Sequence, residues 1–336
     1  MHLYKLLFFN TMIIGTFMAI SAYSWLCMWM GLEMNLLSII PLLSKNKNIY
    51  PAESAMKYFI TQTMASIILL FAIISSLNLM ESIYLNYSYS FMIMLNSTLM
   101  IKMGAAPFHF WFPMIMEGLN WMNCLIMLTW QKIAPMVILM YNYNFTAFMS
   151  LIIISSSMIG SLMSINQISL RKMMTYSSIN HISWMLASMM LSKSLWLVYF
   201  FIYSLISINI ILIFNSMNMF YIKQMFNSMN SNKMLKFLLT TNFLSLGGLP
   251  PFIGFFPKWI TINLMIMNNF IILSFIMILF TLIILYMYIR ITFNSFIINS
   301  MENIKYSSQN LNFSIISFNM ISLLSLIFCP LILSLF

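Results

Sequence analysis

Gly104-Ala-Ala-Pro-Phe-His-Phe-Trp-Phe-Pro113 and Gly248-Leu-Pro-Pro-Phe-Ile-Gly-Phe-Phe-Pro257 follow one pattern, Gly-x-x-Pro-Phe-x-x-aromatic-Phe-Pro. The same offset separates the two glycines and the two final prolines. Proline lacks a backbone N–H and disfavours helix in the residue before it, so each stretch should interrupt a helix. Two unrelated proline kinks would share neither residue order nor offset, which favours a helix break that occurs twice in the chain.

The composition places these breaks in a membrane. Hydrophobic residues make up 62% of the 336 residues, charged residues make up 6%, and the mean hydropathy is +0.94. Soluble domains carry about 25% charged residues, so the solvent for most of this chain must be lipid. The net charge of +10 is too thinly spread over apolar sequence for a nucleic-acid-binding surface. Interrupted backbone in lipid is tolerated only beside a cavity or inside protein.

A spanning helix needs about 20 apolar residues. When clusters of polar residues are taken as the boundaries of apolar stretches, the sequence predicts about eleven such spans. Stretches long enough for loops are 44–54, 78–90, 217–235 and 294–312. The predicted spans are 4–22, 24–43, 55–77, 91–116, 121–142, 145–164, 169–190, 194–216, 236–268, 269–293 and 313–335.

Basic residues orient these spans. With Met1 on one side, the opposite side carries only Lys193 among the basic residues at or beside span ends. The positive-inside rule therefore predicts that Met1 faces the cytoplasm-like side, which in a mitochondrion would be the matrix, and that Phe336, after an odd number of spans, faces the opposite side. The residues on the Met1 side are Lys5, Lys45, Lys47, Lys57, Arg171, Lys172, Lys223, Lys233, Lys236, Arg290 and Lys305.

The two broken spans begin on opposite sides, so the repeated pattern predicts an inverted repeat. We expect an all-α polytopic membrane protein with two inverted five-helix repeats and one further C-terminal transmembrane helix. The first repeat is 1–143 with its break at 104–113, and the second is 144–293 with its break at 247–257. Residues 294–336 form a loop and the last helix. Secondary transporters place ion sites at such breaks.

Four ionisable residues remain inside predicted spans: Glu33, Lys102, Lys132 and Lys258. Each lies roughly ten residues from a span end, which is about 15 Å deep. A charge there costs at least about 2.5–3.5 kcal/mol. A buried Glu–Lys pair that only holds helices together is the structural alternative, but one acid cannot pair with three bases. The set therefore favours proton-exchanging groups in a hydrated channel.

The remaining composition indicates the compartment. Methionine occurs 38 times, and residues of A/T-rich codons dominate, as in proteins encoded by animal mitochondrial DNA. The first predicted span starts within a few residues of Met1, with no sign of a cleavable targeting peptide. Cys27, Cys124 and Cys329 lie in apolar runs without CxxC spacing, so we expect reduced, unpaired core residues.

At these motifs the chain resembles the subunit 2 family of mitochondrial NADH dehydrogenase, which are antiporter-like membrane subunits of respiratory complex I. The resemblance covers nearly the whole chain, and the motifs together are highly specific. Family members in animals resemble bacterial relatives that have three more N-terminal helices. The motifs are Trp29-Met-Gly-Leu-Glu-Met-Asn35, Lys102 through Pro113, Trp130-Gln-Lys-Ile-Ala-Pro135, Ser169-Leu-Arg-Lys172, Tyr176-Ser-Ser-Ile-Asn-His181 and Leu246 through Trp259.

The resemblance implies residue roles. Glu33, Lys102, Lys132 and Lys258 would be the main proton-translocating groups, with His109 and His181 as secondary members. For His109 a packing role is equally favoured, whereas a relay role is slightly favoured for His181. Arg171 and Lys172 are better explained as orientation charges.

The resemblance also implies a proton-translocating NADH:ubiquinone reductase in which this chain carries no cofactor. NADH, FMN, Fe–S clusters and ubiquinone would bind other subunits. In agreement with this, the sequence has no dinucleotide-binding motif and no cysteine cluster. Implied partners are the antiporter-like subunit 4, small subunits such as 4L, and membrane lipids such as cardiolipin, without nucleic acid. A stand-alone cation/proton antiporter and a purely structural membrane subunit remain the alternatives.

Overall fold

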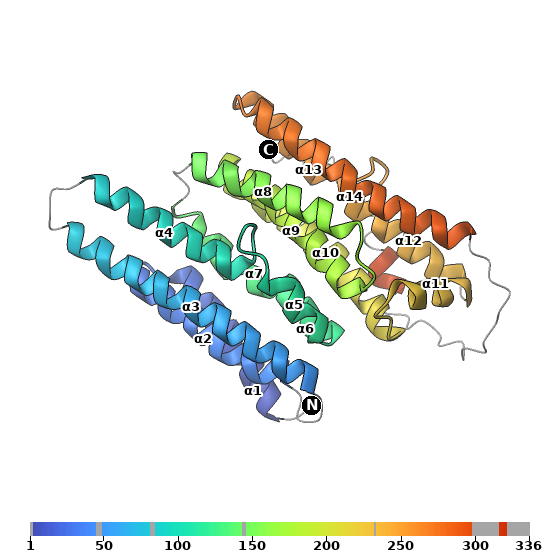
Figure 1. Cartoon of the computed structure of the whole chain (residues 1–336), viewed down its shortest axis with the longest axis horizontal. Helices are drawn as coiled ribbons and strands as arrows, with labels where there is room; N and C mark the ends of the chain where they lie inside the picture. Colours follow the sequence, from blue (N-terminus) through green and yellow to red (C-terminus); the bar gives the residue numbers. More distant parts are fainter. Residues whose placement is uncertain are drawn as a thin grey trace. The chain divides into compact units, whose positions relative to one another are not determined.

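The computed structural model describes residues 3–44, 49–80, 85–142, 146–231, 233–297 and 316–320. The expected all-helical architecture is confirmed: apart from one isolated bridge between Ser169 and Tyr221, every regular element in these ranges is a helix (Figure 1). The chain divides into two compact units, Met1–Ile152 and Ile153–Phe336.

The helices of the first unit are α1 (Leu3–Ser21), α2 (Trp25–Leu43), α3 (Ile49–Met80), α4 (Leu85–Met103), α5 (Trp111–Gly118), α6 (Trp121–Leu128) and α7 (Trp130–Leu139). Helix α8 (Thr146–Ser164) contains the boundary between the units. The second unit continues with α9 (Leu170–Leu191), α10 (Lys193–Ser216), α11 (Ile222–Ser231), α12 (Lys233–Gly247), α13 (Phe255–Met267) and α14 (Ile271–Ile297).

Seven segments of the described chain are long and apolar enough to cross a membrane, so the protein is a multi-pass membrane protein. They are α1, α2, α3, the pair α6–α7, α8, α10 and α14. Four predicted spans do not meet these criteria, each for a visible reason. Spans 91–116 and 236–268 are each divided into two helices, and α9 is too polar. Span 313–335 lies almost wholly outside the described residues.

Helix α9 is polar because it is enclosed by protein. Almost all of its residues are buried, including Ser178, Asn180 and Ser183. A glycine on α8 allows the close approach, because a Cβ at Gly160 would come within 2.8 Å of the Asn180 backbone nitrogen. Inside a bundle, serine hydroxyls can bond to their own helix, and Ser183 donates to the Asn180 carbonyl oxygen at 2.6 Å. Hydropathy along the sequence therefore under-rates this helix as a span.

Small residues bring α1 and α2 together in the first unit. A Cβ at Gly31 would lie 2.6 Å from the Ala19 backbone nitrogen, and one at Gly15 would lie 3.0 Å from the Asn35 nitrogen. Small residues permit such close backbone packing between membrane helices. The contact fixes the face of α2 on which Asn35 lies, while α3 contacts α2, α4 and α5.

The break after α4 is closed by a glycine. Gly104 has φ +74°, and the N–H groups of Gly104 and Ala105 both donate to the Met100 carbonyl oxygen at 3.0 Å. This is a left-handed C-terminal cap, in which glycine avoids the steric cost of positive φ. The helix resumes at Trp111, whose indole N–H donates to the Ile101 carbonyl oxygen at 3.0 Å.

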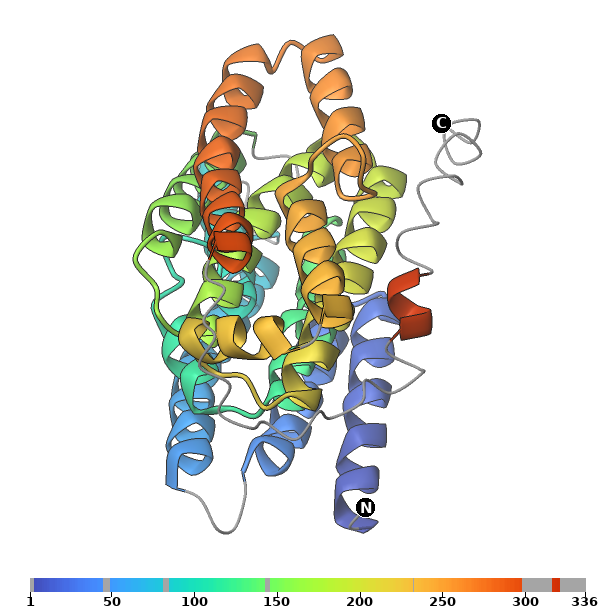
Figure 2. The same ribbon diagram turned by 90° about the vertical axis from the view of Figure 1, so that its right-hand side faces the viewer.

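The break after α12 repeats this cap. Gly248 has φ +79°, and Gly248 and Leu249 donate to the Leu244 carbonyl oxygen at 3.1 and 3.3 Å. The returning chain passes very close to α12, because a Cβ at Gly254 would overlap the Ser245 carbonyl oxygen. Helix α13 then forms a hairpin with α14 (Figure 2).

A third interruption, between α6 and α7, was not expected from the sequence. At Thr129 the backbone leaves helical geometry, with φ −113° and ψ −71°. The Leu125 carbonyl oxygen accepts both the Thr129 hydroxyl, at 2.8 Å, and the Thr129 N–H, at 3.0 Å. Pro135 supplies no N–H to the carbonyl of Gln131, one turn before it. The predicted span 121–142 is therefore a pair of short helices.

The predicted loops also differ in part from the structure. Stretch 217–235 contains the short helix α11, and α3 begins inside stretch 44–54. Cys27 has a free thiol on α2, but it is exposed, so the expectation of a core position is wrong for this residue. Cys124 is buried on α6, where its thiol lies 3.8 Å from the Met116 carbonyl oxygen. Cys329 lies outside the described residues.

Candidate functional site

Three of the predicted site residues lie on neighbouring elements of the first unit. Glu33 is on α2, Lys102 is in the last turn of α4, and Lys132 is in the first turn of α7. Lys102 and Lys132 are buried, with 8% and 1% of their surfaces exposed, whereas Glu33 is half-buried. No ion pair joins Glu33 to Lys102 in the described chain, although Glu33 lies within electrostatic range of Lys102 and Tyr58.

Two buried amides connect the helices that carry Glu33 and Lys132. Asn35 Nδ2 donates to Gln131 Oε1 at 3.2 Å, and Gln131 Nε2 donates to Asn35 Oδ1 at 2.9 Å. The Tyr58 hydroxyl of α3 also donates to Gln131 Oε1, at 3.3 Å. Asn35 follows Glu33 by two residues, and Gln131 directly precedes Lys132. The amide pair therefore fixes the backbone that carries both ionisable groups.

A small cavity of about 20 Å³ adjoins this amide pair. Lys102, Tyr58 and Gln62 contribute to its wall together with both amides. Gln62 is buried, and its Nε2 has no hydrogen-bond partner. A cavity that holds one water needs about 10–15 Å³, and buried polar groups without protein partners are normally satisfied by water. The cavity therefore has room for one water in contact with this group of residues.

Lys132 contacts the interrupted fourth span, and His109 lies within its interruption. Lys132 Nζ lies 5.4 Å from the centroid of the Phe112 ring on α5, a distance typical of a cation–π contact. His109 is buried in the segment between α4 and α5, and its Nδ1 lies 3.3 Å from the Pro107 carbonyl oxygen. The Trp130 indole N–H, two residues before Lys132, is buried without a partner.

Lys258 occupies a different setting in the second unit. It is 7% exposed, and its ammonium donates to the Gly247 carbonyl oxygen at 2.9 Å and to the Leu246 carbonyl oxygen at 3.3 Å. These carbonyls end α12, where the helix has no further N–H donors. The C-terminal end of a helix also attracts positive charge through its dipole. Lys258 is therefore held by backbone at the break, and no described carboxylate pairs with it.

His181 lies in the same unit among aromatic hydroxyl groups. Its Nδ1 is 3.0 Å from the Tyr199 hydroxyl of α10, and its ring centroid is 5.1 Å from that of Tyr203. On the same helix, Asn180 Oδ1 and the Trp184 indole N–H are buried without hydrogen-bond partners. These polar atoms can be satisfied by water close to His181.

Sequence reasoning missed the uncharged members of the site: Asn35, Gln131, Tyr58, Gln62 and Tyr199. Asn35 and Gln131 lie within motifs whose charged neighbours were recognised, and their mid-span position was the available signal. Among the described residues, no group of three or more His, Cys, Asp or Glu side chains could hold a metal ion.

Comparison with known proteins identifies the family of this chain. The transmembrane family described as NADH:quinone oxidoreductase/Mrp antiporter matches residues 22–285. NADH-ubiquinone oxidoreductase chain 2 of Anopheles gambiae is 48% identical over 96% of this chain and 93% of its own length. The chain belongs to the NADH-ubiquinone oxidoreductase chain 2 family. A chain 2 protein of Locusta migratoria is 42% identical over 96% of this chain and 94% of its own length.

Solved structures support the antiporter-like fold of this chain 2 family member. A chain of respiratory complex I from Thermus thermophilus superposes with a TM-score of 0.83 at 18% identity, covering 97% of this chain and 79% of that chain. A chain of the Mrp complex from Dietzia sp. gives 0.74 at 14% identity, covering 84% and 58%. At such identities the likeness concerns the fold alone. Membership in the chain 2 family makes the protein an antiporter-like membrane subunit of complex I.

Proposed function

We propose that this complex I subunit moves protons from the matrix to the intermembrane space through Glu33, Lys102, Lys132 and Lys258, with His109 and His181 as secondary members. The main support is the environment of the Lys102 side chain. This buried lysine lines a water-sized cavity with the unpartnered Gln62 amide, and Glu33 lies within electrostatic range but forms no ion pair with it. A structural role would be expected to show a direct salt bridge between the two groups, whereas here a water in the cavity would give Lys102 a partner for proton exchange.

The proposed switch uses the distance between Glu33 and Lys102. A nearby carboxylate stabilises the charged form of a lysine, and burial disfavours that form. When Glu33 is drawn away or neutralised, the Lys102 proton leaves through the cavity water. The Asn35–Gln131 pair would keep α2 and α7 in place during this change, because both amides stay mutually bonded. Each charge moved against 100 mV costs about 2.3 kcal/mol, which the redox reaction must supply.

Further transfer would pass from Lys132 to Lys258. The Trp130 indole N–H on α7, the helix of Lys132, has no hydrogen-bond partner, and the same holds for Asn180 Oδ1 and the Trp184 indole N–H on α9, the helix of His181. Such groups support a hydrated path, since water satisfies buried polar atoms. Lys258 would exchange its proton at the end of α12.

The same proposal includes the membrane architecture. Eleven spans, inverted repeats at 1–143 and 144–293, and a terminal segment at 294–336 would place Met1 in the matrix and Phe336 in the intermembrane space. The two glycine-capped breaks, at Gly104 and Gly248, support equivalent positions in the two repeats. The mitochondrial inner membrane is the compartment that the chain 2 relatives suggest.

The proposed partners are complex I subunits of the membrane arm, including the antiporter-like subunit 4 and small subunits such as 4L. NADH, FMN, Fe–S clusters and ubiquinone would be bound elsewhere in the complex. Membrane lipids such as cardiolipin would surround the chain.

The test replaces Lys102 with Met in the assembled complex, reconstituted into liposomes. Proton uptake, measured with a pH-sensitive dye, and NADH oxidation are recorded together. We expect coupled proton transport to fall about a hundredfold or more, the scale of a lost acid–base group. Lys57→Gln is the matched control, because Lys57 is 47% exposed and pairs with Glu53 on one face of α3. Normal proton transport with Lys102→Met would refute the proposal.

A further inference from the structure

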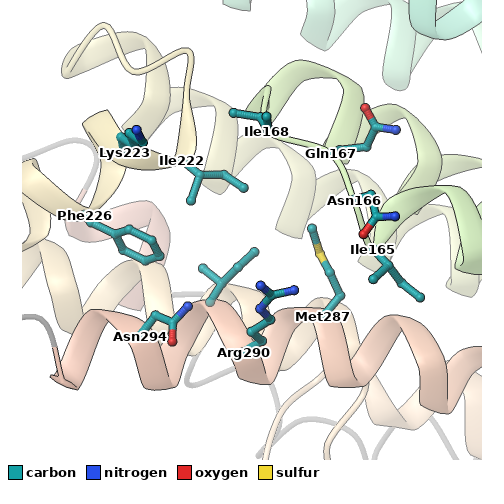
Figure 3. Close-up of a pocket in the computed structure, with 11 residues that line it drawn as sticks. Ile165, Asn166, Gln167, Ile168, Ile222, Lys223, Phe226, Met287, Arg290 and Asn294 are labelled. Carbon is teal, nitrogen blue, oxygen red and sulfur yellow. The ribbon is translucent and has the colours of Figure 1, made fainter.

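A pocket of about 410 Å³ lies in the second unit, and Lys258 is not among the residues that line it (Figure 3). Its walls come from the connection between α8 and α9, from α11, and from the C-terminal half of α14. Figure 3 shows the Arg290 guanidinium rising from α14 toward this space, with Lys223 on the α11 side. The volume is in the range of sites that bind small molecules.

The pocket is held open by backbone pairing. The Leu170 N–H donates to the Phe220 carbonyl oxygen at 2.9 Å, and the Ile222 N–H donates to the Ile168 carbonyl oxygen at 3.2 Å. These bonds form the isolated bridge between Ser169 and Tyr221. They attach the start of α11 to the start of α9, so α11 faces α14 across the pocket.

The chain path puts the pocket at a membrane surface. Helix α8 ends and α9 begins beside it, and α14 reaches Arg290 after nineteen residues from Ile271. Nineteen residues of helix rise about 28 Å, close to the thickness of the hydrocarbon layer of about 30 Å. Arg290 therefore lies at the headgroup level if α14 starts at the opposite surface. This is the surface to which the positive-inside rule assigns the matrix.

The charge of the pocket is positive. Arg290 and Lys223 are both exposed, and no carboxylate is among the described residues that line the pocket. Lys223 stands in the first turn of α11, where the helix dipole disfavours a cation. A bound anion would relieve this unfavourable placement. Asn166 and Asn294 add amide donors to the wall.

The remaining wall is apolar. Ile165, Ile168, Phe226 and Met287 line the same space as the two cations. An inorganic anion would gain nothing from this apolar surface, whereas a lipid would place its headgroup at the cations and the start of its acyl chain on the apolar wall. Basic pockets between transmembrane helices at this surface are suited to anionic lipid headgroups.

We propose that this pocket binds the phosphate headgroup of an anionic phospholipid, through Arg290 and Lys223. The inference depends on the proposed placement in the membrane but not on proton transfer, so it can fail or hold independently of pumping. Inorganic phosphate shares the headgroup chemistry and serves as a competitor in the test.

The test uses the assembled complex in nanodiscs that contain a photoactivatable phosphatidylglycerol or a phosphatidylcholine with the same acyl chains. Cross-linked peptides are identified by mass spectrometry, and NADH oxidation reports the integrity of the complex. We expect the anionic lipid to label segments 165–168, 222–226 and 287–294 more strongly than the neutral lipid. Each surface cation contributes about fivefold to anionic lipid binding, so Arg290→Gln with Lys223→Gln should bring labelling down to the neutral-lipid level.

Two controls keep the result specific. Arg290→Lys with Lys223→Arg keeps both charges and should retain the labelling, and Lys193→Gln removes one charge from a residue that does not line the pocket. Equal labelling by both lipids, or unchanged labelling in the double Gln variant, would overturn the proposal. Displacement of the anionic lipid by inorganic phosphate, but not by chloride of equal ionic strength, would support recognition of the headgroup phosphate by the two cations.

Discussion

Lys258 combines two tasks at one position of the second unit. Its ammonium supplies donors to the carbonyls of Leu246 and Gly247, and its positive charge complements the end of α12. In the first unit, Lys102 instead faces a cavity, and Gln131 receives donors from two helices. Because the two lysines have different surroundings, substitutions at each position should distinguish the contribution of the charge from the contribution of side-chain packing.

Lys258→Met should destabilise the complex and stop coupled pumping. The two carbonyls lose their donor, at a cost of about 1–3 kcal/mol for a buried group left unsatisfied. Lys258→Arg keeps a cation and donors but cannot release a proton at any working pH. We expect Arg to restore thermal stability of the complex without restoring proton transport in liposomes. Pumping by the Arg variant would contradict a role for titration of Lys258.

Gln131→Leu and Asn35→Leu should each destabilise the first unit, because each leaves the other amide buried without its partner. The expected cost of each is about 1–3 kcal/mol. The double variant should cost less than the sum of the two single variants, with a coupling energy of about 0.5–3 kcal/mol. Resistance to proteolysis on heating, measured on the assembled complex, checks this. Strict additivity would show that the amide pair contributes nothing specific.

At the scale of the elements, the two glycine caps decide where helices stop. Gly247 and Gly248 are adjacent but differ sharply in surroundings. A Cβ at Gly247 would meet its nearest atom at 3.5 Å, whereas one at Gly248 would lie 2.9 Å from Lys258 Nζ and would also require φ +79°.

Gly248→Ala should therefore destabilise the break by about 1–2 kcal/mol from the left-handed backbone alone, whereas Gly247→Ala should be tolerated. The pair differs by one position and adds the same methyl group. Assembly of the complex and its apparent unfolding temperature provide the measurement. Equal effects of the two substitutions would show that the φ of Gly248 is not a constraint.

Two helix breaks could be predicted because each lies in a stretch with several prolines. The third break, at Thr129, has no proline beside it and was not predicted. There the nearest proline is six residues later, and the Thr129 hydroxyl and N–H both donate to the Leu125 carbonyl oxygen. Helix α11 was also missed, because a ten-residue helix of mostly polar residues resembles a loop in composition. Glu33 and the lysines were recognisable by formal charge. Asn35 and Gln131 were not, because uncharged polar residues occur throughout these spans and only folding shows which of them meet.

At the scale of the whole molecule, the sequence assigns opposite surfaces to Lys223 and Lys193. Single cysteines at these positions, in a chain with Cys27, Cys124 and Cys329 replaced by Ser, should label differently in mitoplasts. A membrane-impermeant maleimide added outside should label Lys193→Cys within minutes and leave Lys223→Cys unlabelled until the membrane is opened. The reverse pattern would contradict the proposed orientation.

The contact between Lys258 and the end of α12 has a mechanical consequence. Protonation strengthens the attraction between the side chain and the helix terminus, so the bound proton and the position of that terminus share one free energy. Thermodynamic reciprocity then requires one coupling free energy for both effects. A displacement of the terminus changes the free energy of proton binding by the same amount by which protonation changes the free energy of the displacement. A force arriving along α12 can therefore be converted into proton release, and an arriving proton into a force on the helix.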